Sequence, residues 1–216
     1  MDYRFNYLKR AKRAARALRW CPFIRMVGLN GSIVREQDTP KSDIDFLIIA
    51  KSGRLYTARC FATILVGLTG YRRHGHKVAG RICLNCYLSD KNPDVLPKDP
   101  RSYYKVANAY RFLIALVDEN QTAQSFFKIN NWMKKYNISG ENYQADLKQN
   151  YFNNFPIKSR KTWEGILSGK FGDYLEEKLM KYQVKRIMSG YKKGDETVAT
   201  KEEIRLHPKK LAVAKN

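Results

Sequence analysis

Two short apolar runs place the strongest constraint on the fold of this chain. Residues 23–29 (FIRMVGL) and 44–50 (IDFLIIA) are rich in branched apolar side chains, which is typical of buried β-strands. The first run leads into the turn Asn30-Gly31-Ser32, and the second begins beside Asp43 and Asp45. The chain therefore needs a β-sheet, with a glycine–serine turn after one strand and two aspartates at the start of another.

The paired aspartates suggest a metal site. Side chains alternate between the two faces of a strand, so Asp43 and Asp45 are expected on the same side. Two carboxylates on one side of an apolar strand repel each other and lose hydration, which a divalent cation usually offsets. Oxygen ligands select a hard ion, Mg²⁺ or Mn²⁺, and such an ion typically also binds substrate phosphates. We therefore expect Asp43 and Asp45 to bind a metal.

The turn at Gly31 and Ser32 complements the aspartates. A glycine lets the backbone approach a phosphate closely, and Ser32 offers a hydroxyl and an amide. A Gly-Ser turn alone is common, and an Asp-x-Asp at a strand start is more often a cap or a loop anchor. The two motifs together, separated by residues 33–42, indicate a site in which one element binds metal and the other binds the anion.

The order of strand, Gly-Ser, spacer, Asp-hydrophobic-Asp and apolar strand resembles the signature of the nucleotidyltransferase superfamily related to DNA polymerase β. The strong match covers residues 23–50, and a family-like sheet would extend to residue 90. The segments Arg72-Arg73-His74-Gly75 and Cys83-Leu84, with Tyr87, are also similar to those of bacterial proteins that carry such a domain. The resemblance implies transfer of a nucleoside monophosphate from a nucleoside triphosphate to an acceptor hydroxyl.

The resemblance also implies roles for individual residues. Gly31 and Ser32 would hold the β- and γ-phosphates of the triphosphate. Asp43 and Asp45 would bind two Mg²⁺ ions that align the acceptor oxygen with the α-phosphate and stabilise the oxygens that attack and leave.

The chain departs from this pattern at the third carboxylate, which the family normally supplies from a later strand. The matching segment here is residues 81–88, where Asn85 is the polar residue in mid-strand and takes the third catalytic position. An amide ligates weakly and cannot act as a base. Asp90 has the opposite parity and could serve only if the strand breaks before it. Either the enzyme works with two aspartates, or catalysis has faded and binding remains.

A dense basic loop precedes this third strand. Its members are Arg72, Arg73, His74, His76, Lys77 and Arg81. We expect the loop beside the site, with Arg72 and Arg73 suited to a triphosphate or a nucleic-acid backbone. The alternative is a solvated surface loop.

A zinc site is a weaker interpretation of the same region. His74 and His76, followed by Cys83 and Cys86, match zinc ligand types. Cysteines three apart on a strand, however, should point to opposite faces. Two half-buried cysteines are the simpler expectation.

The remaining sequence predicts an α+β chain, with a small mixed-sheet core, an N-terminal helix and a C-terminal helical region. Helical periodicity predicts helices over 3–19, 54–69, 103–117, 126–136 and 161–190. We expect an α/β core over 1–95 and a helical region over 96–192, after a proline-rich linker. Residues 193–216 are expected to form a charged tail that lies on the surface or is partly mobile.

Composition limits the partners and the compartment. Lys and Arg number 41 against 20 Asp and Glu, a net charge of +21, which favours polyanions such as nucleic acid. The basic face of helix 3–19 could contact such a partner or stay solvated. The 44% of hydrophobic residues supports a core, and no apolar run approaches the ~20 residues of a membrane span, so we expect no membrane insertion.

We expect the chain to be cytoplasmic with reduced thiols, because its 4 cysteines make no disulfide framework and no secretory signal precedes them. An Arg-rich start is also typical of organellar transit peptides, but this one runs directly into the first predicted strand.

The sequence thus predicts a metal-dependent nucleotidyltransferase with an unidentified acceptor, RNA being favoured by the charge over a protein side chain or a small molecule. The alternative is a catalytically degenerate nucleotidyltransferase-fold protein that binds nucleotide or RNA. A component of a toxin–antitoxin pair is a third option. The sequence does not indicate the oligomeric state.

Overall fold

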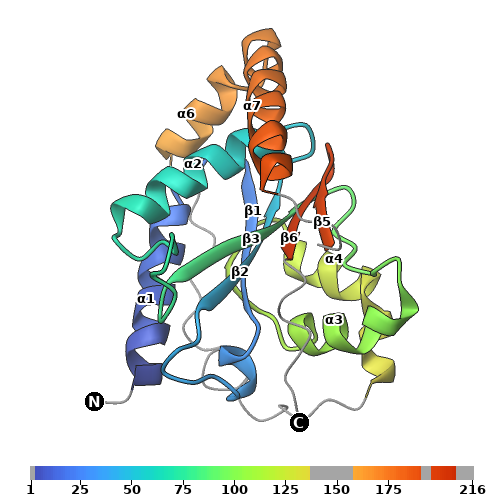
Figure 1. Ribbon diagram of the computed structural model, residues 1–216. Helices are drawn as coiled ribbons and strands as arrows, with labels where there is room; N and C mark the ends of the chain where they lie inside the picture. The colour runs from blue at the N-terminus through green and yellow to red at the C-terminus, as the bar shows by residue number, and fades with distance from the viewer. Residues whose placement is uncertain (1–2, 137–157, 191–195, 208–216) are drawn as a thin grey trace.

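The structure is a computed structural model that describes residues 3–136, 158–190 and 196–207 (Figure 1). It is an α+β fold with an N-terminal helix, one six-stranded mixed sheet and C-terminal helices, which confirms the expected class. The strands are β1 (Ile24–Asn30), β2 (Ile44–Ala50), β3 (Ile82–Ser89), β4 (Ile114–Asp118), β5 (Glu196–Ala199) and β6 (Glu203–His207). The helices are α1 (Tyr3–Leu18), α2 (Leu55–Leu68), α3 (Tyr103–Tyr110), α4 (Thr122–Ile129), α6 (Lys158–Ile166) and α7 (Lys170–Ser189).

The sheet has the order β4-β1-β2-β3-β6-β5, so the two strands with the sequence motifs lie at its centre. β1 and β2 are antiparallel and place Asn30 opposite Asp45, while β2 and β3 are parallel. Both motif strands are buried along most of their length, as their apolar runs predicted. The turn after β1 and the start of β2 therefore meet at one end of the sheet.

Helices α1 and α2 lie together against one side of the sheet, and α3 and α4 lie on the other side in Figure 1. The side of α1 that faces the core is mostly alanine, and its buried residues are Tyr7, Ala11, Ala14, Ala15 and Leu18. Gly28 on β1 approaches Leu113, which follows α3, so closely that a Cβ at residue 28 would lie 2.6 Å from its side chain. This close approach brings the chain after α3 onto the face of the sheet that Gly28 shares with Leu47, its partner on β2.

The prediction of one helix over residues 103–117 was wrong. The helix α3 ends at Tyr110, and Ile114–Asp118 forms β4, which pairs antiparallel with β1. The apolar residues of this segment fit helical spacing, but four consecutive apolar residues from Ile114 also suit a strand buried on both faces. These residues form a strand and not a helix because, as a strand, they pair with the free edge of β1.

The prediction of a charged tail from residue 193 was also wrong for the part that the structure describes. Residues 196–199 and 203–207 form a hairpin, and β6 pairs antiparallel with β3, with Ile204 opposite Tyr87. The apolar residues Ile204 and Leu206 alternate with charged ones, a period of two that a high net charge obscures. All three expected parts of the chain contribute strands to one sheet.

Two other predicted helices are divided. Residues 126–136 lie in α4 and in a short 3-10 segment, Asn131–Lys135. The helix expected over 161–190 consists of α6 and α7, with a break at residues 167–169. At this break Gly172 packs so closely on the carbonyl of Leu167 that no Cβ would fit there. Gly172 is therefore the glycine that this break requires, whereas Gly165 and Gly169 have open space around their Cβ positions.

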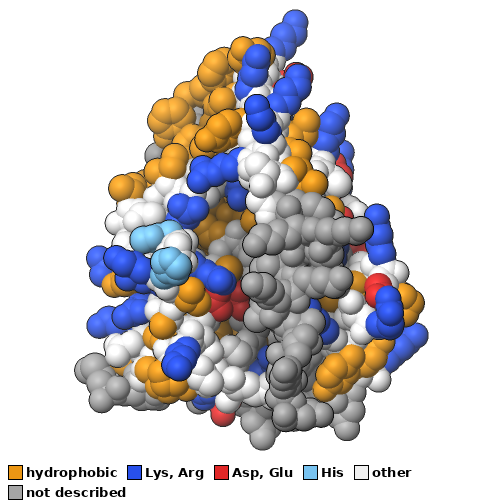
Figure 2. Space-filling model, in the orientation of Figure 1, with side chains coloured by type: hydrophobic (Ala, Val, Ile, Leu, Met, Phe, Trp, Pro, Cys, Tyr) orange, Lys and Arg blue, Asp and Glu red, His pale blue; other side chains and the backbone are white. Residues whose placement is uncertain are grey.

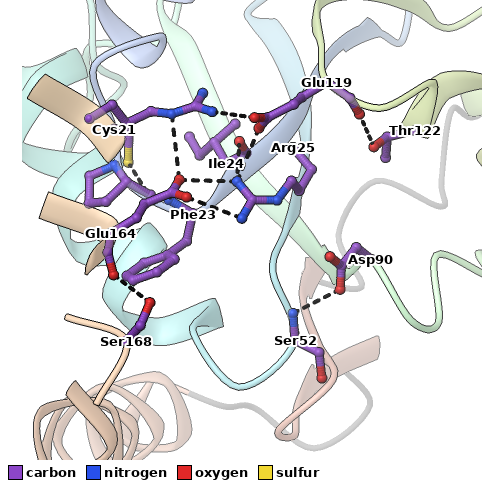
Figure 3. A network of polar contacts seen from close by, with 12 residues as sticks. Cys21, Phe23, Ile24, Arg25, Ser52, Asp90, Glu119, Thr122, Glu164 and Ser168 are labelled. Atoms are coloured by element: carbon purple, nitrogen blue, oxygen red, sulfur yellow. Dashed lines mark hydrogen bonds and ion pairs between the residues drawn. The ribbon is translucent and has the colours of Figure 1, made fainter. Parts of the chain in front are cut away.

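A network of ion pairs fastens α6 to the central sheet (Figure 3). Arg25 on β1 lies between two carboxylates and pairs with Glu164 of α6 and with Glu119, each at 3.0 Å. Arg160 of α6 also pairs with Glu119, at 2.6 Å, and Glu164 accepts the amide proton of Phe23. Burial acts to raise the pKa of Glu164, but hydrogen bonds from Arg25 and from the amide of Phe23, together with the charges of Arg25 and Arg160, lower it.

No helix in the described ranges combines the length and the apolar character needed to cross a membrane.

Candidate metal and phosphate site

The two motifs open into one large cavity of about 1040 Å³ at the end of the sheet. Gly31 and Ser32 form one part of its wall and Asp43 and Asp45 form another. Asn85 of β3 also lines the cavity. Its basic lining residues are Arg35, Lys41, Arg59, Arg72, Arg73 and Lys105. Figure 2 shows acidic surface within a hollow at the centre of the molecule, beside basic side chains and histidines. The sequence-predicted site residues therefore come together, inside a basic rim.

Gly31 fits its position for two reasons. Its φ of +80° is a backbone conformation that glycine adopts without strain. A Cβ at this position would also lie 2.6 Å from Oδ2 of Asp45. The amide of Gly31 is already used, since it donates to the carbonyl oxygen of Ala109. Contact of the turn with an anion would thus fall to Ser32 rather than to the amide of Gly31.

The two aspartates have different environments. Asp43 forms an ion pair with Arg73, whose Nη1 lies 2.5 Å from its Oδ2. Asp45 accepts a hydrogen bond of 3.3 Å from the amide nitrogen of Asn85. Burial and the neighbouring Asp43 carboxylate raise the pKa of Asp45 to about 7, although Arg73 and Asn85 act in the opposite direction. A cation at this site would favour the ionised form of Asp45.

A bulge in β3 changes which of its side chains face the aspartates. Asp45 pairs with Cys83, but Leu47 pairs with Cys86, so β3 has one extra residue between these points. Residues paired across parallel strands share a face, so Cys83 and Cys86 lie on the same face. The prediction that these cysteines point to opposite faces was wrong, because a regular period of two does not hold across a bulge.

Cys83 lies beside the aspartates because it pairs directly with Asp45, ahead of the bulge. Within the described ranges, Asp43, Asp45 and Cys83 are the one group of three or more acidic, His or Cys residues whose ligand atoms all lie within 4.8 Å of one another. Burial, and then the Asp45 and Asp43 carboxylates, raise the pKa of the Cys83 thiol. The group has the charge and spacing to bind a divalent cation.

The other candidates for a third ligand are placed differently. Asn85 contacts Asp45 through its amide N–H group, so it supports the aspartate as a donor. Asp90 lies beyond the far end of β3, where its side chain accepts the amide proton of Ser52. His74 lines the cavity but is not in the group with Cys83, so the His and Cys residues of the weaker zinc interpretation do not converge.

Several cavity residues were not singled out from the sequence. Lys105, Asn108 and Tyr110 come from α3, whose aromatic residues suggested only a core helix. The polar positions 105 and 108 are three apart and so share a helix face, which was the available signal. Arg35 donates to Oδ1 of Asn108 at 3.0 Å and joins the turn after β1 to α3. Tyr110 makes a hydrogen bond with Cys86 in the buried floor.

Asn30 is a further cavity residue that the sequence did not indicate. It ends β1 opposite Asp45, lines the cavity, and has only 4% of its surface exposed. Its side-chain oxygen is buried with no hydrogen-bond partner among the described residues. A buried carbonyl oxygen without a donor is costly unless a ligand or ion supplies the missing partner.

The fold and site together describe an α+β protein with an acidic–thiol cluster inside a basic cavity. Comparison with protein-family models, with curated proteins and with solved structures finds no match for this chain. The function of this chain therefore has to be inferred from the site itself.

Proposed function

We propose that this chain is a metal-dependent nucleotidyltransferase that moves a nucleoside monophosphate from a nucleoside triphosphate to an acceptor hydroxyl, with RNA as the acceptor. The observation that supports this most is the meeting of Asp43 and Asp45 with the Gly31-Ser32 turn at one basic cavity. The acidic pair suits a divalent cation, and the basic rim suits the phosphates that the cation would neutralise. The cavity volume of about 1040 Å³ suits a nucleotide together with an acceptor end.

In this proposal the chain's own residues orient the reactants. Arg72 and Arg73 contact the triphosphate, Ser32 contacts its terminal phosphates, and Asp43 and Asp45 hold Mg²⁺ or Mn²⁺. When bound, the ions supply charge stabilisation at the attacking and leaving oxygens. The acceptor oxygen bonds to the α-phosphorus, the bond from that phosphorus to the bridging β-oxygen breaks, pyrophosphate leaves, and the hydroxyl proton passes to water.

RNA is favoured as the acceptor because a basic surface continues from α1 to the cavity. Arg10 and Arg13 of α1 lie over the ring of Tyr71, at 5.5 and 5.8 Å from its centroid. Tyr71 directly precedes Arg72 and Arg73, which line the cavity. A pocket of about 270 Å³ lies between this ring and Lys9. Arginines around a half-buried aromatic ring are suited to a phosphate backbone, and the open edge of such a ring can contact a base.

The second candidate function is a binding protein without turnover. The ion pair between Arg73 and Asp43 favours it, because a guanidinium there balances part of the charge that a metal would otherwise offset. The donation from Asn85 to Asp45 has a similar effect. In such a protein the cavity would hold nucleotide or RNA, and the aspartates would need no metal.

The test is a transfer assay with each labelled nucleoside triphosphate, Mg²⁺ or Mn²⁺, and bulk RNA. We expect label in RNA with the natural chain, and none with Asp43→Ala or Asp45→Ala. Glu177→Ala, on the exposed surface of α7, is the matched acidic control and should keep full activity. Transfer that survives both aspartate substitutions would exclude this site. No transfer, together with nucleotide or RNA binding, would favour the binding protein.

A further inference from the structure

The residue beside the paired aspartates is a thiol rather than the third carboxylate or the amide that the sequence suggested. Ligand atoms of Asp43, Asp45 and Cys83 all lie within 4.8 Å of one another. Metal–oxygen bonds of about 2.0–2.2 Å and metal–sulfur bonds of about 2.3 Å put two ligands of one ion at most about 4.5 Å apart. Small side-chain rotations would therefore bring all three onto a single ion.

Arg73 shows that a cation can contact two of these ligands, Asp43 and Cys83, together. Its Nη1 lies 2.5 Å from Oδ2 of Asp43 and 3.5 Å from Sγ of Cys83. The Arg73 side chain is 42% exposed and belongs to the loop before β3, so it can move toward solvent or toward a phosphate. An ion that replaced it would meet the same carboxylate and the same sulfur.

An independent observation indicates a ligand at the same place. Asn30 faces the cavity from β1, directly opposite Asp45, with 4% of its surface exposed and its side-chain oxygen unpartnered among the described residues. This oxygen provides a fourth donor from the adjacent strand. Two carboxylates, a thiol and an amide oxygen together form a four-ligand set of mixed hardness.

We infer that Cys83 is a metal ligand and that the ion bound by Asp43, Asp45, Cys83 and Asn30 is a thiophilic divalent cation of the Zn²⁺ and Co²⁺ class, preferred over Mg²⁺. The inference rests on the proposed metal site, and it replaces the Mg²⁺ or Mn²⁺ of the proposed function by an ion of this class. On binding, the Cys83 S–H bond breaks, its electron pair forms the metal–sulfur bond, and the proton passes to water. No oxidation or reduction occurs. The Zn²⁺ ligands differ from the His and Cys set that the sequence suggested.

The experiment uses the full chain, freed of metal by a chelator and then titrated with Co²⁺, Zn²⁺ and Mg²⁺. A cobalt–thiolate bond gives a charge-transfer absorption that oxygen and imidazole ligands do not give. We expect this band in the natural chain, and Zn²⁺ or Co²⁺ binding at least about tenfold tighter than Mg²⁺ binding. Absence of the band in the natural chain, with Co²⁺ bound, would overturn the inference.

Variants locate the sulfur. Cys83→Ser should lose the band and most of the preference for Zn²⁺ or Co²⁺ over Mg²⁺. If the serine variant does not fold, Cys83→Ala is measured in its place. Cys60→Ser is the matched control, because Cys60 is a half-buried free thiol on α2 outside the ligand group. It should keep the band, and a band that survives Cys83→Ser would contradict the assignment. Asn30→Ala should weaken Zn²⁺ binding and leave the band in place.

The outcome also separates this inference from the proposed function. Mg²⁺-supported transfer that requires Asp43 and Asp45 but is unchanged in Cys83→Ser, without a cobalt–thiolate band, would refute thiol ligation and leave the transferase proposal standing. A cobalt–thiolate band that requires Cys83, in a chain that transfers no nucleotide, would support thiol ligation and refute the transferase proposal.

Discussion

Gly31 is the residue whose replacement best separates backbone strain from contact with the site. Gly31→Ala would put an L-residue at φ +80° and a Cβ 2.6 Å from Oδ2 of Asp45. Gly70→Ala is the matched control, because Gly70 has φ +76° and open space around its Cβ position. In urea unfolding we expect a loss of about 1–2 kcal/mol for the control and a larger loss for Gly31→Ala. Divalent-ion binding should weaken in Gly31→Ala only, and equal effects would contradict the contact with Asp45.

The pKa of Asp45, raised to about 7, predicts how stability depends on pH without metal. Between about pH 4 and pH 7 the unfolded chain releases this proton while the folded chain retains it, so stability falls as the pH rises. The loss is a few kcal/mol at most, since one pKa unit is worth about 1.4 kcal/mol. In the presence of a chelator, the stability of Asp45→Asn should not show this decline. Its free energy of unfolding should therefore rise relative to that of the natural chain between about pH 5 and pH 8. Parallel pH profiles of unfolding free energy for the two proteins would show that Asp45 does not carry the effect.

At the scale of elements, the sequence predicted those parts of the site that depend on one strand alone. The strands β1, β2 and β3 were predicted from their apolar runs, and the parity of Asp43 and Asp45 followed from a regular strand. The position of Cys83 opposite Asp45 and the shared face of Cys83 and Cys86 did not follow from one strand, because the register and the bulge of β3 appear only when its pairing with β2 is known. The contributions of α3 and of Asn30 likewise depend on which strands and helices meet, which no local period specifies.

The hairpin of β5 and β6 gives the prediction that belongs to this scale. Ile204 is fully buried opposite Tyr87 on β3, so Ile204→Ala should lower the free energy of unfolding by about 2–4 kcal/mol. Lys201→Ala, at the exposed turn between the two strands, should change it by less than about 0.5 kcal/mol. Denaturant unfolding of both variants provides the test. A negligible effect of Ile204→Ala would mean that residues 203–207 behave as the surface tail that the sequence suggested.

At the scale of the whole molecule, the structure shows where basic residues that contribute to the net charge of +21 lie relative to the cavity. The acidic side chains in the cavity wall are Asp43 and Asp45, while the exposed side of α1 and the loop after Tyr71 form a basic surface that leads to the cavity. The charge therefore bears on affinity for the acceptor, and the aspartates bear on the chemistry. The two roles should separate experimentally, because substitutions on α1 do not touch the metal ligands.

Charge reversal on α1 tests this separation. Lys9→Glu with Arg13→Glu places negative charge at two exposed positions beside Tyr71. Lys185→Glu with Arg186→Glu changes the net charge equally on α7, which does not line the cavity. With a short labelled single-stranded RNA, the α1 variant should bind more weakly, and its plot of log affinity against log salt should be shallower by about 1–2, since each phosphate contact contributes about 0.7. The α7 variant should remain close to the natural chain. Equal losses would mean that RNA responds to net charge alone, and binding to anionic vesicles without binding to RNA would assign the surface to a membrane instead.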